Sequence, residues 1–370
     1  MQFKLKTTIY MFDRWKEFCK AFSVGRGDLI ITNGHIYENC LKDFIGEAVI
    51  INMRKYGCGE PNDGMVEAIR KDILDITYNR VIAVGGGSIL DVAKLFALKD
   101  ISPVQELFER KLKIVKEKEL ILLPTTCGTG SEVTNLSILE IKNKKTKFGL
   151  AADEIFADYA VLIPELLDTL PFESFAASSI DAFIHAIESY LSPKANPFTE
   201  MYSKKAMELI LMGYQSVAKE GEQARFSYRK EFLLAGTYAG IAFGNAGCAA
   251  VHALSYPLGS LFHIAHGEAN YAMFLGVFNK YMKLCPEGKI KALNLFLCEL
   301  LECEENNVYQ EIELLFSRIL PKKSLFGYGV TMEQLKEFTE SVIKNQGRLL
   351  ANNYVVLQES DIYEIYQSVY

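Results

Sequence analysis

The chain has 370 residues, and a typical domain has roughly 150, so the length alone predicts two domains. Apolar residues make up 49% of the chain and charged residues 23%, which is typical of a globular enzyme and excludes a disordered or fibrous chain. The net charge of −6 argues against a nucleic-acid-binding protein and against a polybasic membrane-surface protein, because both classes carry a basic surplus.

The cysteines and the first residues indicate a cytoplasmic protein. The eight cysteines form no C-x-x-C pair and no zinc-ribbon spacing, so we interpret them as reduced, buried thiols. Residues 1–6 contain no apolar segment that resembles a signal peptide. No uncharged apolar run reaches the ~18 residues of a membrane-spanning helix. We therefore expect a cytoplasmic location and no membrane partner.

Five short apolar runs in the first half of the chain predict strands of a parallel sheet. Each run ends near a Gly, Pro or Asn, and uninterrupted apolar runs of this length fit strands that are buried on both faces. The runs cover residues 29–31, 48–51, 81–84, 120–123 and 160–163. Longer stretches of helical character separate them, such as residues 63–76, and this alternation is typical of a doubly wound α/β domain.

The second half of the chain has helical patterns only. Helices are predicted over residues 178–191, 199–214, 228–242, 248–256, 289–301, 306–319, 331–345 and 360–370. We therefore expect an α/β domain over residues 1–165 and an all-helical domain over residues 166–370.

A run of three glycines lies between a predicted strand and a predicted helix. Gly85, Gly86 and Gly87 follow the run at 81–84, and helical sequence begins after Ser88. Glycines let the backbone turn tightly and let a ligand approach closely, and the free N–H groups of the following helix suit a phosphate. This order predicts phosphate or dinucleotide binding, although an ordinary strand-to-helix turn is the alternative and the G-x-G-x-x-G fingerprint is not present.

A second loop follows the next predicted strand. Residues 124–132 are rich in Gly, Ser and Thr, which together offer many N–H and O–H donors. Such a loop lies at the carboxyl ends of the strands, where ligands of α/β sheets bind. A simple Ser/Thr-rich connector is the alternative.

The histidines are scarce but concentrated. Asp181 and His185 are four residues apart in a predicted helix, which places both side chains on one face. For this pair alone, a buried Asp–His hydrogen bond is the alternative to a metal site. His252, His263 and His266 form a second apolar cluster, and buried imidazoles need partners such as a metal ion. One Asp with two or three His suits Fe²⁺, Zn²⁺ or a similar ion. We interpret Cys248, four residues before His252, as a packing residue.

These motifs together resemble the iron-dependent (group III) alcohol dehydrogenases. The resemblance runs from about residue 25 to the C-terminus and rests on four motifs in the same order, which are 85–94, 124–132, 181–188 and 252–267. Within the family the chain most resembles the bacterial 4-hydroxybutyrate dehydrogenases. The segments that carry this finer resemblance are 245–247, 255–257, 267–271 and 349–354.

The resemblance implies a fold like that of dehydroquinate synthase, with a dinucleotide-binding α/β domain and a helical metal-binding catalytic domain. It implies the metal ligands Asp181, His185, His252 and His266, with Fe²⁺ as the ion and Zn²⁺ or Mn²⁺ as alternatives. It implies an NAD cofactor whose pyrophosphate lies on Gly86, Gly87 and Ser88. Further positions that line the cofactor are Asp91, Thr125, Thr126, Ser131 and Lys147.

Two positions depart from the family pattern. Asn33 stands where many members carry the Asp that holds the adenosine ribose, so NAD is expected but NADP is not excluded. Tyr256 stands where many members carry a further histidine, which puts a proton relay through that position in doubt. His263 matches a position near the substrate and the nicotinamide, and is a candidate for proton relay.

The implied activity is hydride transfer between NAD(H) and a primary alcohol or aldehyde, with 4-hydroxybutyrate and succinate semialdehyde as the first candidates. Arg348 is our candidate for binding the substrate carboxylate, because arginine recognises carboxylates in a bidentate manner, although a surface arginine is the alternative. The rival functions are a butanol or 1,3-propanediol dehydrogenase, a dehydroquinate-synthase-like lyase, and a non-catalytic metal- or nucleotide-binding protein. We expect a homodimer with a small-molecule substrate and no nucleic-acid partner.

Overall fold

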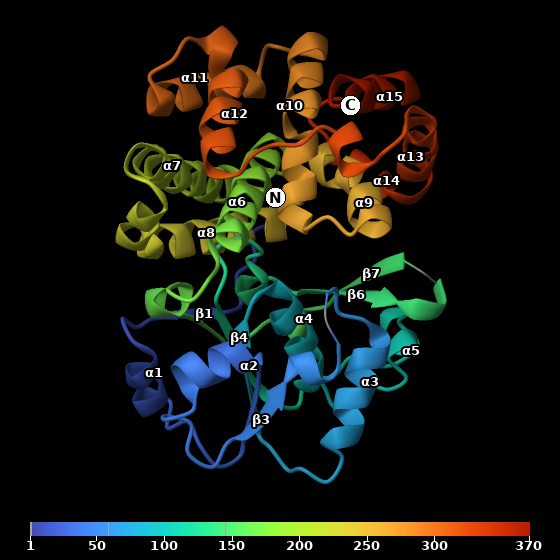
Figure 1. Cartoon of the computed structure of the whole chain (residues 1–370). Helices are drawn as coiled ribbons and strands as arrows, with labels where there is room; N and C mark the ends of the chain where they lie inside the picture. The colour runs from blue at the N-terminus through green and yellow to red at the C-terminus, as the bar shows by residue number, and fades with distance from the viewer. Residues whose placement is uncertain (1, 58, 145) are drawn as a thin grey trace. The chain divides into compact units, whose positions relative to one another are not determined.

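The computed structural model describes residues 2–57, 59–144 and 146–370, and they form two compact units (Figure 1). One unit is Leu5–Leu170, which we call the α/β unit. The other is Pro171–Tyr370 together with the residues up to Lys4, which we call the helical unit. The division after Leu170 lies a few residues beyond the predicted boundary at 165, and the first residues of the chain belong to the second unit.

The α/β unit is built on a six-stranded parallel sheet with the order β1-β8-β5-β4-β2-β3. The strands are β1 (Thr8–Met11), β2 (Asp28–Thr32), β3 (Val49–Asn52), β4 (Arg80–Gly85), β5 (Glu119–Pro124) and β8 (Tyr159–Leu162). All five predicted apolar runs form strands of this sheet. The edge strand β1 was not among the predicted strands, although Ile9, Tyr10 and Met11 are apolar, and all four of its residues are exposed.

Helices cover both faces of the sheet, as a doubly wound fold requires. Alternate residues of one strand point to opposite faces, so Val81 packs in the core under α3, α4 and α5, and Ile82 packs in the core under α1 and α2. The helices are α1 (Trp15–Ala21), α2 (Gly34–Ile36), α3 (Asp63–Asp72), α4 (Gly87–Phe96) and α5 (Val104–Phe108). The α/β class predicted for this half of the chain is confirmed.

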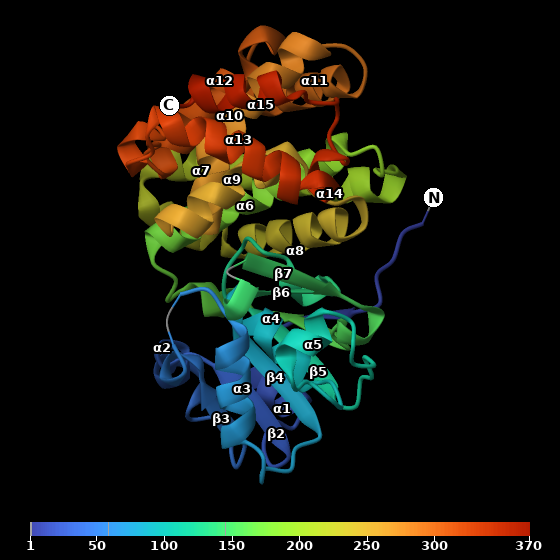
Figure 2. The same ribbon diagram turned by 90° about the vertical axis from the view of Figure 1, so that its right-hand side faces the viewer.

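A separate antiparallel hairpin of β6 (Leu136–Ile141) and β7 (Thr146–Ala151) belongs to the same unit (Figure 2). The sequence pattern does not predict this hairpin, because residues 136–151 carry charged side chains and no long apolar run. Leu139, Ile141 and Leu150 nevertheless point into the core beside α4.

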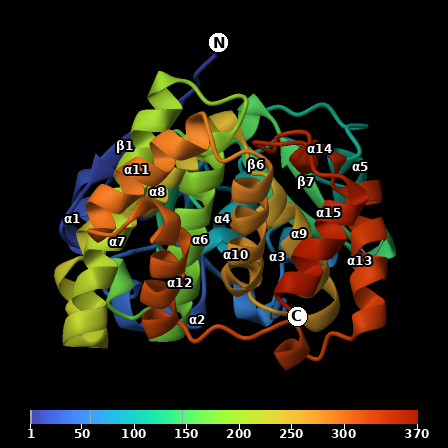
Figure 3. The same cartoon turned by 90° about the horizontal axis from the view of Figure 1, so that it is seen from above.

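The helical unit is made of helices packed around α6 (Figure 3). The helices are α6 (Phe172–Leu191), α7 (Pro197–Glu220), α8 (Arg229–Ala246), α9 (Ala250–Phe262), α10 (His266–Leu284), α11 (Lys289–Leu301), α12 (Val308–Ile319), α13 (Met332–Asn345), α14 (Gly347–Leu350) and α15 (Glu359–Ser368). All eight predicted helices are present. α6 is buried almost continuously from Phe175 to Leu191 and packs against α7, α8 and α10.

α10 was not predicted, although it spans 19 residues. Its two interior glycines obscure the pattern, since a glycine inside a helix disfavours it by about 1 kcal/mol relative to alanine. Close packing against neighbouring segments explains both glycines. A Cβ on Gly267 would lie 2.0 Å from the carbonyl oxygen of Ala177 in α6, and one on Gly276 would lie 2.8 Å from Val369. The glycines therefore allow α10 to approach its neighbours closely.

Seven of the cysteines lie within the described residues, and Cys19, Cys40, Cys248, Cys285, Cys298 and Cys303 are free thiols. Cys58 lies outside the described residues. Cys19 and Cys127 are buried, but the other five are partly exposed, so the prediction of uniformly buried thiols is wrong for Cys40, Cys248, Cys285, Cys298 and Cys303.

Among the described residues, no single helix combines the length and the apolar composition of a membrane span. Only α8 and α9 taken together reach that composition, and they are bent by 106° relative to each other.

Candidate active site

The first half of a candidate metal site lies on α6. Asp181 and His185 are one helical turn apart, and both are buried. The Nδ1 atom of His185 lies 3.9 Å from Oδ2 of Asp181. The i,i+4 spacing therefore places the carboxylate and the imidazole on one face of the helix, as the sequence predicts.

α9 and α10 add two further imidazoles to this face. Nε2 of His252 lies 3.7 Å and Nε2 of His266 lies 3.8 Å from Oδ1 of Asp181. The ligand atoms of Asp181, His185, His252 and His266 all lie within 4.8 Å of one another. Four ligands at 2.0–2.2 Å from one ion are roughly 3.4 Å apart, so these side chains need only small shifts to surround an ion.

The chemistry of the donors also fits a divalent cation. Nε2 of His252 is buried and has no hydrogen-bond partner among the described residues. A buried polar atom without a partner is unfavourable, and a bound cation would supply the missing contact. The set offers one carboxylate and three imidazoles, which suits Fe²⁺, Zn²⁺ or Mn²⁺.

Asn270 and Ser255 support the carboxylate of this cluster, and the sequence analysis gave neither a role. Asn270 Nδ2 donates a hydrogen bond of 2.7 Å to Oδ1 of Asp181, and the hydroxyl of Ser255 donates one of 2.5 Å to Oδ1 of Asn270. Burial acts to raise the pKa of Asp181, but the three imidazoles and Asn270 outweigh it and hold that pKa below its ordinary value. The sequence does place Asn270 four residues after His266, which puts both side chains on one face of a helix.

The three predicted catalytic residues lie outside the four-residue cluster. Tyr256 is on α9, one turn after His252, and is partly buried. His263 ends α9 in the left-handed conformation, with φ of 53°, and its side chain is exposed. Arg348 is exposed on α14, which packs against α9.

Two of the segments that carry the finer resemblance meet at the start of α9. Asn352 donates through Nδ2 to the carbonyl oxygens of Ala246 and Cys248, at 2.8 and 3.2 Å. Gly247 has φ of 80°, and a Cβ there would lie 2.9 Å from Nδ2 of Asn352. Asn352 therefore requires a glycine at 247 and fixes the backbone that leads to His252.

In the α/β unit, the glycine run joins β4 directly to α4. Gly85 ends the strand and Gly87 begins the helix, with Gly86 as the N-cap. None of the three has a positive φ, so the backbone conformation alone does not require glycine at these positions. Space is the reason instead: a Cβ on Gly85 would lie 2.5 Å from Ile89, and one on Gly87 would lie 2.6 Å from Thr129. The turn leaves the first N–H groups of a ten-residue helix free of side-chain caps, as an anion site requires.

The loop at residues 124–132, which we call the Thr-rich loop, lies against the glycine run. This is expected because both follow neighbouring parallel strands. The N–H of Thr125 donates to the carbonyl oxygen of Gly85 at 3.0 Å. A Cβ on Gly86 would lie 3.2 Å from Cγ2 of Thr126. Both loops therefore share the carboxyl edge of neighbouring strands β4 and β5.

Asp91 and Ser131 form hydrogen bonds inside the unit. The Ser131 hydroxyl donates to Oδ1 of Asp91 at 2.6 Å, and the N–H of Ile138 donates to Oδ2 at 3.0 Å. Nζ of Lys94 donates to Oγ of Ser131 at 2.7 Å and to the carbonyl oxygen of Leu136 at 2.6 Å. Lys94 is fully buried, and burial lowers its pKa although Asp91 acts in the opposite direction. This network fixes the Thr-rich loop and β6 to α4.

Asn33 and Lys147 occupy two further positions in this unit. Asn33 follows β2, next to β4, and its Oδ1 accepts the N–H of Ile36 at 2.9 Å. Lys147 lies on β7 and forms an ion pair of 2.9 Å with Glu60.

Comparisons with known proteins give the family. A model described as "Iron-containing alcohol dehydrogenase" matches residues 9–164, and one described as "Fe-containing alcohol dehydrogenase family, C-terminal" matches residues 175–370. The 4-hydroxybutyrate dehydrogenase of Clostridium kluyveri is 49% identical over 367 residues, which cover 99% of both chains. Long-chain-alcohol dehydrogenase 1 of Geobacillus thermodenitrificans is 37% identical and covers 80% of this chain and 76% of its own.

Solved structures show the same fold. The structure of a 1,3-propanediol oxidoreductase has a TM-score of 0.86 and 22% identity and covers 100% of this chain and 99% of its own. The sulfoacetaldehyde reductase of Bifidobacterium kashiwanohense, solved with NAD+, has a TM-score of 0.85 and 24% identity, with coverages of 100% and 98%. The two family models together span most of both units, and the chain therefore belongs to the iron-containing alcohol dehydrogenase family.

Proposed function

We propose that this protein is a metal-dependent dehydrogenase that transfers a hydride between NAD(H) and a primary alcohol or aldehyde, with 4-hydroxybutyrate and succinate semialdehyde as the substrate pair. The observation that carries the proposal is the cluster of Asp181, His185, His252 and His266, of which the first three are buried, in a chain that belongs to a family of alcohol dehydrogenases. In the oxidative direction the alcohol loses a hydride to NAD+ and a proton from its hydroxyl, and becomes the aldehyde.

We assign the four residues of the cluster as ligands of Fe²⁺, in keeping with the name of the family. When bound, the ion supplies a Lewis acid that polarises the substrate oxygen and lowers the pKa of the alcohol. Zn²⁺ and Mn²⁺ suit the same donors, and metal availability decides among such ions. Tyr256 and His263 are our candidates for carrying the hydroxyl proton away.

We assign the carboxyl edge of the α/β unit as the NAD site. The free N–H groups after Gly86, at Gly87 and Ser88, would hold the pyrophosphate, and Thr125 and Thr126 would lie beside it. Asn33 would bind the adenosine ribose without repelling a 2′-phosphate, so NADP is the alternative. Lys147 would also line this site. Asp91 and Ser131 would act by fixing the Thr-rich loop to α4, since the hydroxyl of Ser131 donates a hydrogen bond to the carboxylate of Asp91.

The substrate is proposed from the relative in C. kluyveri, which is named a 4-hydroxybutyrate dehydrogenase. Such a substrate carries a carboxylate, for which Arg348 is our candidate partner. Arg348→Ala is expected to raise KM for 4-hydroxybutyrate far more than KM for 1-butanol. Equal effects on both substrates would exclude a role of Arg348 in carboxylate binding.

The deciding experiment is a substrate panel on protein reconstituted with Fe²⁺, Zn²⁺ or Mn²⁺. It compares kcat/KM for 4-hydroxybutyrate, 1-butanol and 1,3-propanediol, each with NAD and with NADP. The highest value is expected for 4-hydroxybutyrate with NAD. A preference for butanol or the diol would make the protein a simple alcohol or diol dehydrogenase, and the absence of net NADH formation with every alcohol would favour a lyase.

We also propose a cytoplasmic homodimer. Six free thiols, those of Cys19, Cys40, Cys248, Cys285, Cys298 and Cys303, support a reducing compartment. β1 supports self-association, because it is an edge strand whose side chains, including Ile9, Tyr10 and Met11, are all exposed. Light scattering on the purified protein is expected to give twice the chain mass of 41.7 kDa, and a monomer would contradict the proposal.

A further inference from the structure

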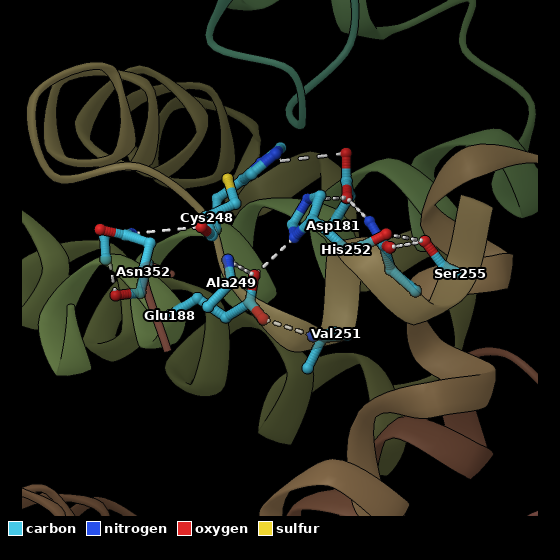
Figure 4. Close-up of polar contacts among 12 residues, drawn as sticks. Asp181, Glu188, Cys248, Ala249, Val251, His252, Ser255 and Asn352 are labelled. Carbon is cyan, nitrogen blue, oxygen red and sulfur yellow. Dashed lines mark hydrogen bonds and ion pairs between the residues drawn. The ribbon is translucent and has the colours of Figure 1, made fainter. Parts of the chain in front are cut away.

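A carboxylate on α6 faces the histidine that α9 contributes to the cluster. Glu188 lies one turn after His185, and its side chain is only 1% exposed. Its Oε2 lies 2.6 Å from Nδ1 of His252 and accepts the N–H of Ala249 at 3.0 Å, and its Oε1 accepts the N–H of Val251 at 2.6 Å (Figure 4). All three donors come from the beginning of α9, so one buried carboxylate organises that end of the helix.

These contacts make Glu188 the N-terminal cap of α9. Ala249, the residue at the N-cap position, has no side chain that can cap, and none of the helix's own side chains does so. The carboxylate from α6 satisfies two free backbone N–H groups and places a negative charge at the positive end of the helix dipole. The position of α9, and with it that of His252, is thereby fixed relative to the helix that carries Asp181 and His185.

The same carboxylate determines which nitrogen of His252 carries the proton. An ionised carboxylate only accepts hydrogen bonds, so Nδ1 at 2.6 Å must be the protonated nitrogen. A histidine must be neutral to bind a metal ion, and with the proton on Nδ1 the lone pair of the neutral ring is on Nε2. Nε2 is the buried atom without a hydrogen-bond partner in the described residues, and it faces Asp181 at 3.7 Å.

Glu188, Cys248 and His252 also lie close enough to hold an ion by themselves. The hydrogen bonds decide against this arrangement. Both oxygens of Glu188 already accept backbone N–H groups, and Nδ1 of His252 is directed at the carboxylate. The carboxylate is therefore placed to support a ligand and not to act as one.

We infer that Glu188 is a positioning residue that fixes the place and the tautomer of His252 so that Nε2 can bind the metal ion. This inference rests on the proposed function for the metal site. Carboxylates that hold the second nitrogen of a metal-binding histidine change metal affinity by about 10- to 100-fold when they are replaced.

Glu188→Gln tests the inference with almost no change in volume. The variant keeps one accepting oxygen, and its NH₂ group can only donate, so it cannot accept all three hydrogen bonds that the carboxylate receives from Ala249, Val251 and Nδ1 of His252. The Co²⁺ affinity of the metal-free protein, measured by competition with a chromophoric chelator, is expected to fall by about 10- to 100-fold. Nitrogen NMR of labelled histidines is expected to show that the Nδ1-protonated form of His252 is lost.

Glu67→Gln is the matched control in the other unit. Glu67 also accepts the first N–H of a helix, from Val104 at 2.8 Å, together with the hydroxyl of Ser102, but it touches no histidine. It is expected to leave Co²⁺ affinity unchanged.

A double-mutant cycle separates positioning from a general loss of structure. If Glu188 acts through His252, Glu188→Gln reduces Co²⁺ affinity in the wild-type background and has no further effect in the His252→Ala background. An equal reduction in both backgrounds, or wild-type affinity and an unchanged tautomer in Glu188→Gln, would overturn the inference. Wild-type protein that binds Co²⁺ but oxidises no alcohol would instead refute the proposed function and leave the inference standing.

Discussion

The two candidate sites use different chemical groups, since one is made of side chains and the other mainly of backbone. The metal cluster consists of ionisable side chains on α6, α9 and α10, and further polar groups hold two of them, since Glu188 contacts His252 and Asn270 contacts Asp181. The glycine run of the α/β unit offers mainly backbone N–H groups at the end of one strand. Buried side-chain ligands need supporting hydrogen bonds, whereas a backbone site needs only empty space.

The glycines of the two units show the same difference. Gly87 leaves room for the side chain of Thr129, and Gly267 leaves room for the backbone of α6. A side chain can be shortened by a second substitution, but a helix backbone cannot, so the two sites should differ in whether a damaging change can be rescued.

The largest effect is expected from removing two imidazoles of the cluster. The double change His252→Ala and His266→Ala should lower kcat/KM by more than the ~100-fold seen when only the support of a ligand is lost, because two ligands are then missing. NADH formation and metal content measure it. His35→Ala, at an exposed histidine of α2, is the control and should retain full activity. Activity that survives the double change would defeat the metal mechanism.

The next effect is expected in the α/β unit, from Lys94→Met. The change removes the cation beside Asp91 and two short hydrogen bonds, so it should lower the free energy of unfolding of that unit by roughly 3–5 kcal/mol. Urea unfolding measures it, with the exposed Lys99→Met as the control. Co²⁺ affinity should stay unchanged, because Lys94 lies in the α/β unit and the metal cluster lies in the helical unit. A large loss of Co²⁺ binding would contradict this expectation.

Lys94 also predicts a dependence on pH. Burial lowers its pKa below the ordinary value of 10.5, so between the two pKa values the unfolded chain binds more protons than the folded one. This group therefore makes stability rise as pH rises towards 10.5, and Lys94→Met should remove that rise.

Gly267→Ala should damage the metal cluster from a distance. The new Cβ would lie 2.0 Å from the carbonyl oxygen of Ala177, so α10 must move away from α6 and carry His266 with it. We expect a loss of stability of about 3 kcal/mol, at the upper end of the usual range for overpacking, together with weaker Co²⁺ binding. Gly347→Ala, where the Cβ meets nothing within 4 Å, is the control. Wild-type Co²⁺ affinity in Gly267→Ala would contradict this prediction. It would mean that α10 can move without displacing His266 from the cluster.

The smallest effect is expected from Gly87→Ala, and it should be reversible. The Cβ would lie 2.6 Å from Cγ2 of Thr129, so stability should fall by roughly 1–3 kcal/mol and the Kd for NAD should rise. Adding Thr129→Ala removes the clashing methyl and hydroxyl groups and should restore part of both losses. A double variant no better than Gly87→Ala would mean that the glycine is needed for direct approach of the ligand.

The sequence was most informative where one short segment contains the whole signal. The run at 81–88 holds a strand, a turn and a helix start, and the spacing of Asp181 and His185 already defines a helix face. α10 was not predicted because its glycines are explained only by close packing against α6 and Val369. Both of these are distant from the glycines in sequence. The role of Glu188 depends on where α9 begins in space, and no local pattern reports that.

The hydrogen bonds of Lys4 have a consequence for the order of folding. The backbone N–H and carbonyl of Lys4 are held by the side chain of Asn245 on α8, at 2.6 and 3.0 Å, whereas the whole of Leu5–Leu170 belongs to the other unit. During synthesis the α/β unit is complete long before α8 leaves the ribosome. Lys4 therefore lacks this partner while the α/β unit folds, and its two hydrogen bonds to Asn245 can form only after α8 has been made.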